Sequence, residues 1–131
     1  MNDTQLLARL RHLDAASLAD ADKSIAVMDT GLRPVAPGLK MVGYARTVQC
    51  ENDFLAVIQA LDEAQENEVL VVDSRGSDRA VVGELFSGEA KRRGLSGIVV
   101  DGLVRDTNAI AQLAFPVFAR GRCPISGTTQ I

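Results

Sequence analysis

The sequence has few residues of the kinds that build covalent or zinc-linked scaffolds. Its 131 residues include two cysteines, one histidine and no tryptophan. Cys50 and Cys123 lie far apart without CxxC spacing, and the histidine, His12, falls in the first expected helix. A structural zinc ion takes four Cys or His ligands, so a site of that kind is excluded. The same shortage argues against a Ser-His-Asp or Cys-His catalytic group.

Long apolar runs and an excess of basic charge are also missing. No apolar run approaches the roughly 20 residues of a membrane-spanning helix, and the N-terminal MNDTQLLARLRHLD has no uninterrupted apolar signal core. The formal net charge is −3, with both signs scattered along the chain. This distribution gives no basic stripe to neutralise a phosphate backbone. We therefore expect a cytoplasmic protein that neither binds nucleic acid directly nor enters a membrane.

The sequence does have enough apolar residues for a core. Hydrophobic residues make up 47% of the chain, and a length of 131 residues is usual for one domain. There is no internal repeat, low-complexity tract or clear linker. We expect a single domain that spans residues 1–131.

The N-terminal third predicts two helices and a loop before the first strand. Leucines at helical spacing predict an amphipathic helix over residues 4–13, and a second helix is expected over 15–21. The stretch TGLRPVAPGLK predicts a long loop, because its prolines and glycines disfavour both helix and strand pairing. MVGYARTVQC then alternates as a strand does, and Asp53 is a helix N-cap candidate before FLAVIQALDEA.

Strands and helices continue to alternate from residue 41 to residue 121. EVLVVDS and SGIVVDG are short apolar runs of the kind that is buried on both faces of a sheet. VVGELFSGEAKRRG and RDTNAIAQLA are helical in pattern, and FPVFARG is a further strand. The alternation predicts an α/β fold with a largely parallel or mixed sheet.

The segment GELF is the first candidate for chemistry. Ligands of open α/β sheets gather outside the carboxyl ends of strands, where this segment is expected. Gly83 is the expected N-cap of a helix that begins at Glu84. The free amides from Gly83 through Glu84 and Leu85 to Phe86 would then favour an anion such as a substrate carboxylate. The alternative is that Gly83 is only a cap and Glu84 only a favourable first-turn acid.

The second candidate is the adjacent pair Arg105 and Asp106 at a strand-to-helix turn. An aspartate can ligate a hard divalent cation while the planar guanidinium binds a carboxylate or keto oxygen of the same ligand. Alternatively, Asp106 is a helix N-cap and Arg105 a surface charge. Twenty residues separate Glu84 from Arg105, enough for one helix and one strand. Such a step can return the chain to the same end of the sheet.

An acid, a twenty-residue gap and then Arg-Asp resemble the hallmark of the 4-hydroxy-4-methyl-2-oxoglutarate aldolase family, which includes the RraA-like regulators of ribonuclease activity. The similarity extends from about Leu18 onward, and its longest segments are MDTGLRPVAPGLKMVGYARTVQC, EVLVVDSRGSDRAVVGELF, AKRRGLSGIVVDGLVRD and FPVFARG. The resemblance implies a swivelling β/β/α fold like that of phosphohistidine domains. It also implies a homotrimer with sites between subunits.

The resemblance further implies an activity and a role for each site residue. The backbone from Gly83 to Phe86 would receive the substrate carboxylate, Arg105 would bind the substrate and Asp106 would bind Mg²⁺ or Mn²⁺. The reaction would be the metal-dependent retro-aldol cleavage of 4-hydroxy-4-methyl-2-oxoglutarate-type 2-oxo acids to pyruvate, with oxaloacetate decarboxylation as a side activity. Glu84 would help to move the proton of the substrate hydroxyl through a water on the metal.

The sequence departs from the family pattern at three places, which limit how far the family's properties transfer to this chain. Ala109 stands where an acid or glycine is common, Glu84 replaces the usual aspartate, and family members continue past the segment PISGTT with a strand-rich tail that we expect this chain to lack. Ala109 and the expected lack of the tail favour a non-catalytic, protein-binding regulator of ribonuclease activity, whereas the retained Arg105 and Asp106 favour the enzyme. A Schiff-base aldolase is disfavoured because the lysines lie in polar or loop-like segments.

Overall fold

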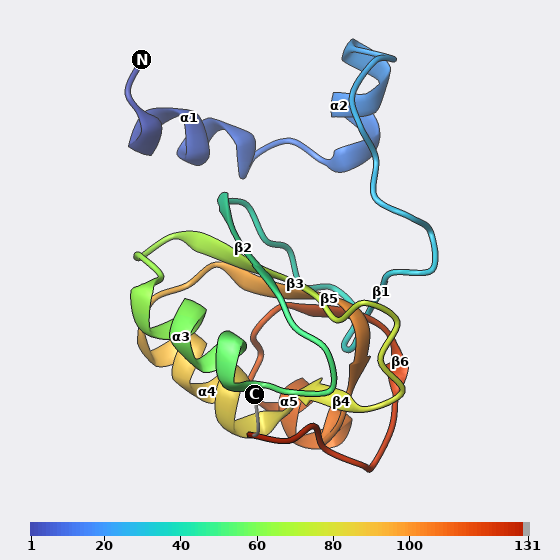
Figure 1. Ribbon diagram of the computed structural model, residues 1–131. Coiled ribbons are helices and arrows are strands. Elements are labelled where there is room, and N and C mark those ends of the chain that lie inside the picture. The colour runs from blue at the N-terminus through green and yellow to red at the C-terminus, as the bar shows by residue number, and fades with distance from the viewer. Residues whose placement is uncertain (130–131) are drawn as a thin grey trace.

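A computed structural model describes residues 1–129 of the chain (Figure 1). Six strands form one sheet with the order β1-β6-β5-β3-β2, and β4 pairs with β5 beside this path. The strands are β1 (Arg33–Pro34), β2 (Tyr44–Gln49), β3 (Glu68–Asp73), β4 (Ala80–Val82), β5 (Gly97–Val104) and β6 (Val117–Arg122). The helices are α1 (Asp3–Leu10), α2 (Ala15–Ala21), α3 (Leu55–Glu63), α4 (Glu84–Arg92) and α5 (Thr107–Gln112).

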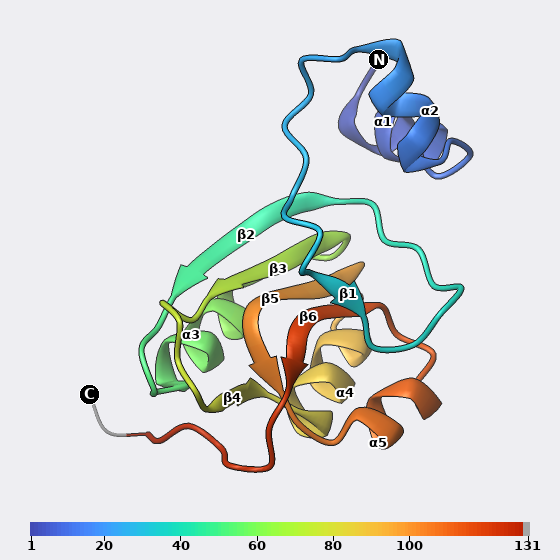
Figure 2. The same cartoon turned by 90° about the vertical axis from the view of Figure 1, so that its right-hand side faces the viewer.

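The sheet is almost wholly parallel, and one of its faces is covered by helices. Strand β1 is antiparallel to β6, while the other strand pairs are parallel. Helices α3, α4 and α5 form a layer on one side of the sheet (Figures 1 and 2). Between helices and sheet, Leu70, Ile98 and Val100 have no exposed surface and belong to the main apolar core. The predicted α/β fold is confirmed.

The opposite face of the sheet lies under an N-terminal arm that consists of α1, α2 and the segment up to residue 32. Between the arm and the sheet is a cavity of about 590 Å³ with a mainly apolar lining, to which Leu18, Val71 and Phe118 contribute. Polar contacts help to hold the arm in place. The Tyr44 hydroxyl donates to Asp3 Oδ1 at 3.0 Å, and Lys40 Nζ donates to the main-chain carbonyls of Arg11 and Leu13, just after α1. Among residues 1–129, no helix is long and apolar enough to cross a membrane.

The predicted elements of the N-terminal third are largely present. Helix α2 has the expected bounds, whereas α1 ends at Leu10, three residues before the predicted end. The expectation of a loop without strand pairing is wrong at Arg33 and Pro34, which pair with β6. Pro34 is tolerated because β1 is an edge strand, where a missing N–H group is not needed by a second neighbour. Asp53 caps α3 from one residue outside the N-cap, since its Oδ1 accepts the amide of Leu55 at 2.7 Å.

Helix α4 begins at Glu84 after the N-cap Gly83, as predicted, but the helical pattern assigned to residues 81–94 is wrong for Val81 and Val82, which belong to strand β4. Val81 and Val82 are buried and extended, and they pair alongside β5 instead of starting the helix. Two adjacent β-branched residues suit a strand better than a helix, and Gly83 separates them from α4. Strand β5 is also longer than predicted and reaches Val104, because a register shift after Val100 lets the strand continue.

Candidate functional site

The two candidate segments leave the sheet at the same edge. Strands β4 and β5 run parallel, with Val82 opposite Val104, so the residues that follow each strand lie side by side. The amide of Arg105 donates to the Val82 carbonyl at 3.1 Å, which fixes the spacing of the two chains. The helix-and-strand step between Glu84 and Arg105 therefore returns the chain to one end of the sheet.

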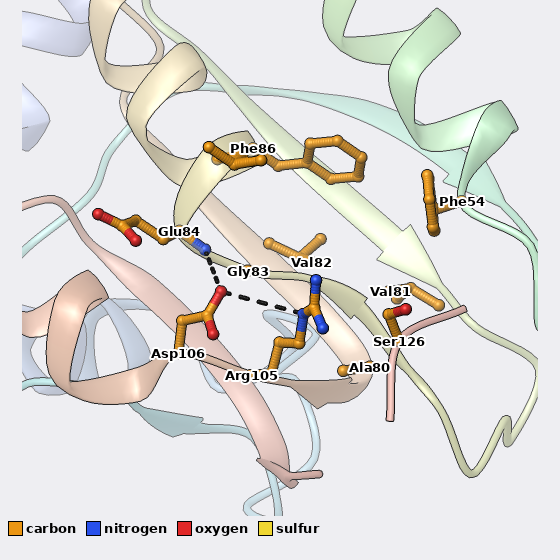
Figure 3. A pocket seen from close by; sticks show the side chains of 11 residues that line it. Phe54, Ala80, Val81, Val82, Gly83, Glu84, Phe86, Arg105, Asp106 and Ser126 are labelled. Carbon is orange, nitrogen blue, oxygen red and sulfur yellow. Dashed lines mark hydrogen bonds and ion pairs between the residues drawn. The ribbon is translucent and has the colours of Figure 1, made fainter. Parts of the chain in front are cut away.

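Asp106 links the two segments. It is the N-cap residue of α5, but its side chain makes no capping bond to that helix. Instead, Oδ2 accepts the amide of Glu84 at 3.2 Å, at the start of α4 (Figure 3). The backbone of Asp106 is left-handed, with φ 59° and ψ 39°, a conformation that aspartate tolerates better than most residues. A carboxylate is thus held at the N-terminus of α4, where the helix dipole favours negative charge.

Gly83 allows this close approach. A Cβ atom at residue 83 would lie 2.7 Å from Asp106 Oδ2 and 3.3 Å from Arg105 Cγ. Gly83 itself has an ordinary extended backbone with φ −144°, so a side chain is excluded by contact and not by backbone strain. The glycine is therefore required by the packing of Arg105 and Asp106 against the start of α4.

Arg105 and Asp106 are close without being locked together. Arg105 Nε lies 4.0 Å from Asp106 Oδ2, and the two side chains are 45% and 42% exposed. An ion pair of this length and exposure contributes little to stability. Both groups therefore remain accessible to a ligand.

A cavity of about 140 Å³ lies next to these charged groups. Its wall includes Phe54 and Phe86, whose rings meet edge to face with centroids 5.5 Å apart at 71°. Figure 3 shows Glu84 and Asp106 on one side of the cavity, Phe54 and Ser126 on the other, and the guanidinium of Arg105 between them. The residues that line the cavity are Phe54, Ala80, Val81, Val82, Gly83, Glu84, Leu85, Phe86, Arg105, Asp106 and Ser126.

All the predicted site residues border this cavity, but their groups are not arranged as expected. The amide of Glu84 is not free, because it already donates to Asp106. The carboxylate of Glu84 is turned away from Arg105 (Figure 3). The side chain of Leu85 is 82% exposed at the rim. The expected binding surface therefore consists of the guanidinium of Arg105 and the later amides of the first turn of α4.

The residues present fit a magnesium-like ion better than a fully protein-bound metal. Within residues 1–129 there is no group of three or more His, Cys, Asp or Glu side chains that could hold a metal. Asp106 offers one carboxylate, and its second oxygen, Oδ1, is not the one that accepts the Glu84 amide. Mg²⁺ often binds through one or two carboxylates while waters and substrate oxygens complete its octahedron. A single aspartate beside a cavity suits that mode of binding.

Sequence reasoning did not identify Phe54 and Ser126. Ser126 is held beside β4 by two main-chain bonds, from the Ala80 amide to the Ile125 carbonyl at 2.8 Å and from the Gly127 amide to the Ala80 carbonyl at 2.9 Å. No local pattern in the segment PISGTT announces this pairing, since it depends on contact with a distant strand. Phe54 has a weak local signal, its place just after Asp53 at the start of a helix.

The other acids at strand ends serve local structure. Asp73 lies opposite Asp101 at the ends of β3 and β5. Hydrogen bonds from Gln49 and from the Arg75 amide lower the pKa of Asp73, and Asp101 accepts a bond from Arg120 Nε. Cys50, at the end of β2, is buried, and burial raises the pKa of its thiol. Among the residues that line the described cavity beside Arg105, none of Asp73, Asp101 and Cys50 is present.

Comparison with known proteins identifies the family. Residues 15–131 match the RraA-like family model, which is described as Aldolase/RraA. The chain belongs to the RraA-like family. Over 121 residues it is 36% identical to a protein of Halalkalibacterium halodurans whose provisional name is 4-hydroxy-4-methyl-2-oxoglutarate aldolase. The match covers 91% of this chain but only 58% of that relative, so the chain spans little more than half of the relative's length.

Two solved structures have the same fold. A protein of Geobacillus kaustophilus named S-adenosylmethionine:2-dimethylmenaquinone methyltransferase superposes with a TM-score of 0.84 at 29% identity, over 90% of this chain and 74% of the other. The RNA-processing inhibitor RraA of Thermus thermophilis superposes with a TM-score of 0.83 at 25% identity, over 90% and 73% of the two chains. These superpositions confirm the fold that the sequence resemblance implies.

Proposed function

We propose that this RraA-like chain catalyses the divalent-metal-dependent retro-aldol cleavage of 4-hydroxy-2-oxo acids, of the 4-hydroxy-4-methyl-2-oxoglutarate type, to pyruvate. Oxaloacetate decarboxylation is the proposed side activity. The observation that carries the proposal is the junction of Arg105, Asp106 and the N-terminus of α4 beside a cavity. The provisional name of the Halalkalibacterium relative supports the same reaction class.

Arg105 and the first turn of α4 would bind the acid end of the substrate. A guanidinium binds a carboxylate through two parallel hydrogen bonds, and it keeps its charge at every physiological pH. The amides of Leu85 and Phe86 belong to the first turn of α4, where main-chain N–H groups have no partner within the helix. Together these groups would orient the 2-oxo acid with its carbon chain along the cavity.

Asp106 would hold the metal, Mg²⁺ or Mn²⁺, and a bound divalent ion supplies positive charge to the carboxylate and keto oxygens of a 2-oxo acid. Arg105 acts on the same oxygens from the side. As the bond between C3 and C4 of the substrate breaks, negative charge develops on the pyruvate fragment, and the guanidinium stabilises it. Gly83 contributes by letting Arg105 and Asp106 approach the helix closely.

Glu84 is the proposed proton acceptor. The substrate hydroxyl must lose its proton for the C4 fragment to leave as an aldehyde or ketone. Glu84 borders the cavity, and a rotation of its side chain from the outward position in Figure 3 would bring the carboxylate over the opening. Glu84→Gln is expected to lower kcat by about 10²-fold or more, in line with the usual contribution of general base catalysis.

Pyruvate release tests the proposal. The purified chain is assayed with 4-hydroxy-4-methyl-2-oxoglutarate, 4-hydroxy-2-oxopentanoate and oxaloacetate, with Mg²⁺ and with a chelator, and release is followed with lactate dehydrogenase. Arg105→Ala is expected to lower kcat/KM by about 10²-fold or more, because it removes charge that the transition state needs. Arg75→Ala is the matched control, since Arg75 is an exposed arginine that pairs with Glu51 at 3.9 Å. Equal loss in both variants, or release that ignores the chelator, would contradict the proposal.

A protein-binding regulator of ribonuclease activity is the second candidate. It is favoured by the fold shared with the RNA-processing inhibitor of Thermus and by the bare Leu85 side chain at the rim of the site. Absence of pyruvate release from well-folded protein, on all three substrates, would favour it over the aldolase. The homotrimer, the single domain and the cytoplasmic location stay predictions.

A further inference from the structure

Two exposed arginines on paired strands have no carboxylate partner. Arg33 lies on β1 and Arg122 on β6, and these strands pair with each other. Within residues 1–129 neither arginine forms an ion pair. The arginines that do pair with an acid there are Arg46, Arg75, Arg92, Arg93, Arg105 and Arg120. Because a guanidinium keeps its charge at every physiological pH, Arg33 and Arg122 leave two positive charges without a counter-charge.

These two arginines border one cavity of about 340 Å³ between β1, β6 and α5 (Figure 2). Thr107 and Asn108, at the start of α5, add a hydroxyl and a side-chain amide to its wall. Arg120 also lines the cavity, but its guanidinium is already paired with Asp29 and Asp101. No aspartate or glutamate is among the described residues of the lining. The cavity therefore has a positive wall that nothing in the described chain neutralises.

The polar groups of this cavity suit an oxyanion. A guanidinium offers hydrogen-bond donors in a planar fork and no acceptor, while the amide and the hydroxyl can also donate. A phosphate group carries about −1.5 to −2 charges at pH 7 and accepts through three oxygens, which matches two guanidinium groups better than one carboxylate does. Val35, Val104 and Ala119 supply an apolar part of the wall. A cavity of this volume is at the lower end of those that bind small molecules.

From these observations we infer that the cavity between β1, β6 and α5 binds a phosphate group, as free phosphate or in a small monoester. Arg33 and Arg122 hold the phosphate through paired hydrogen bonds, and Asn108 and Thr107 donate to its remaining oxygens. Two unpaired arginines on a chain of net charge −3 are too few to bind a nucleic-acid backbone, so the ligand is a small molecule.

This phosphate site is distinct from the site beside Arg105. The two cavities have no lining residue in common. The inference is therefore independent of the proposed aldolase function, and its test needs no turnover.

Titration with phosphate, followed by NMR of the isotope-labelled chain, tests the inference. Inorganic phosphate is added while chloride keeps the ionic strength constant, since exposed charges are screened by salt. The backbone amide signals of Thr107, Asn108 and Arg122 are expected to shift and to reach saturation. Signals that move linearly without saturation, or saturable shifts confined to Arg105 and the start of α4, would overturn the inference.

Removing either positive charge should weaken this binding. Arg33→Gln and Arg122→Gln are each expected to raise the Kd for phosphate by about tenfold or more, because each removes charge-assisted hydrogen bonds. Arg9→Gln is the matched control, since it removes the same charge from an exposed arginine of α1 that does not border the cavity. An unchanged Kd in Arg33→Gln and Arg122→Gln with folding intact, or an equal rise in Arg9→Gln, would contradict the assigned site.

A variant of the other cavity separates the two anion sites. Arg105→Gln removes the guanidinium beside Asp106 and is expected to leave the saturation of the Thr107 and Asn108 signals unchanged. A rise in Kd as large as that in Arg122→Gln would mean that phosphate binds beside Arg105 instead.

Two further ligands identify the kind of anion. Glycerol 3-phosphate carries its phosphate on a short carbon chain. Tighter binding of this monoester than of inorganic phosphate would assign the cavity to a phosphorylated metabolite, whereas equal or weaker binding would assign it to free phosphate. Malonate has two carboxylates and no phosphate, and it is expected to bind more weakly than both. Malonate that binds as tightly as the phosphate ligands, or more tightly, would overturn the assignment to phosphate.

Discussion

The two faces of the central sheet carry similar side chains but are covered differently. On β5, Ile98 and Val100 point into the layer of α3, α4 and α5, whereas Val99 between them points to the cavity under the N-terminal arm. In the sequence, the residues of β5 that face the helices and those that face the arm are equally apolar. An apolar sheet face therefore predicts that another part of the chain covers it, but it does not predict how closely that part packs. The candidate site belongs to the packed side, because α4 and β5 frame it.

The largest expected difference between the two faces is in the free energy of unfolding after valine-to-alanine changes at neighbouring positions. Val100→Ala removes two methyl groups from a residue with no exposed surface, and it is expected to lower the free energy of unfolding by about 2–3 kcal/mol. Val99→Ala should lower it by about 1 kcal/mol or less, since Val99 already borders a cavity and its loss creates little new enclosed space. Urea unfolding of both variants measures the difference. Equal losses would mean that the arm packs as closely as the helices.

Alanine substitutions at two glycines of the packed side distinguish an effect on site geometry from an effect on helix stability. Gly83→Ala should lower pyruvate release by about tenfold or more, because the new Cβ would push Arg105 and Asp106 from the start of α4. Gly88→Ala lies in the same helix, where a Cβ meets open space. It should leave release unchanged and stabilise the protein by about 0.5–1 kcal/mol. Similar kinetics in the two variants would show that contact at residue 83 does not position the site.

Amide hydrogen exchange compares the stability of the arm with that of the central sheet without any mutation. Amides of α1 and α2 are expected to exchange about 10²-fold faster than those of β3 and β5, because the arm contributes few buried side chains and α2 has none. The measurement is residue-resolved exchange by NMR on the unmodified chain. Protection of the arm equal to that of the central strands would show that it unfolds only with the whole sheet.

The smallest effect concerns charge on the outer surface of the packed side. Hydrogen bonds from Arg92 and Arg93 lower the pKa of Glu89 from 4.5 to about 2. A carboxylate with a depressed folded-state pKa stabilises the protein above its unfolded pKa, and this contribution is lost as the pH falls from 4.5 towards 2. NMR titration should show the low pKa, and the double variant Arg92→Gln with Arg93→Gln should return it towards 4.5. No upward movement in the variant would contradict the assigned cause.

Much of the fold could be predicted because its signals are local. The bounds of α2 and the strand character around Glu68–Asp73 follow from apolar spacing within a few residues. The start of α4 at Glu84 was predicted, but strand β4 before it was not, because three residues are too few to show a period of two. Strand β1 escaped prediction because only its pairing with β6 makes it a strand. Such pairings depend on residues far away in the sequence.

The candidate site likewise contains residues that local sequence signals predict and residues that they do not. Gly83, Arg105 and Asp106 stood out because glycine and charged residues at strand-to-helix turns are visible in sequence, and the twenty-residue spacing fits one helix and one strand. Ser126 depends on a bridge to Ala80 that no local pattern encodes. The bond from the Glu84 amide to Asp106 joins two turns that the sequence could bring near each other but not orient.

Through that hydrogen bond, Asp106 competes with incoming anions for the amide of Glu84. While Oδ2 occupies the Glu84 amide, an incoming anion can use this donor only by displacing a carboxylate that is already tethered beside it. Any ligand that draws Asp106 away would therefore increase the affinity of the helix end for anions. By thermodynamic reciprocity, an anion bound there would favour the released Asp106 by the same factor. Binding of a ligand to Asp106 and binding of an anion to the N-terminus of α4 would then be positively cooperative, because both compete with the same hydrogen bond.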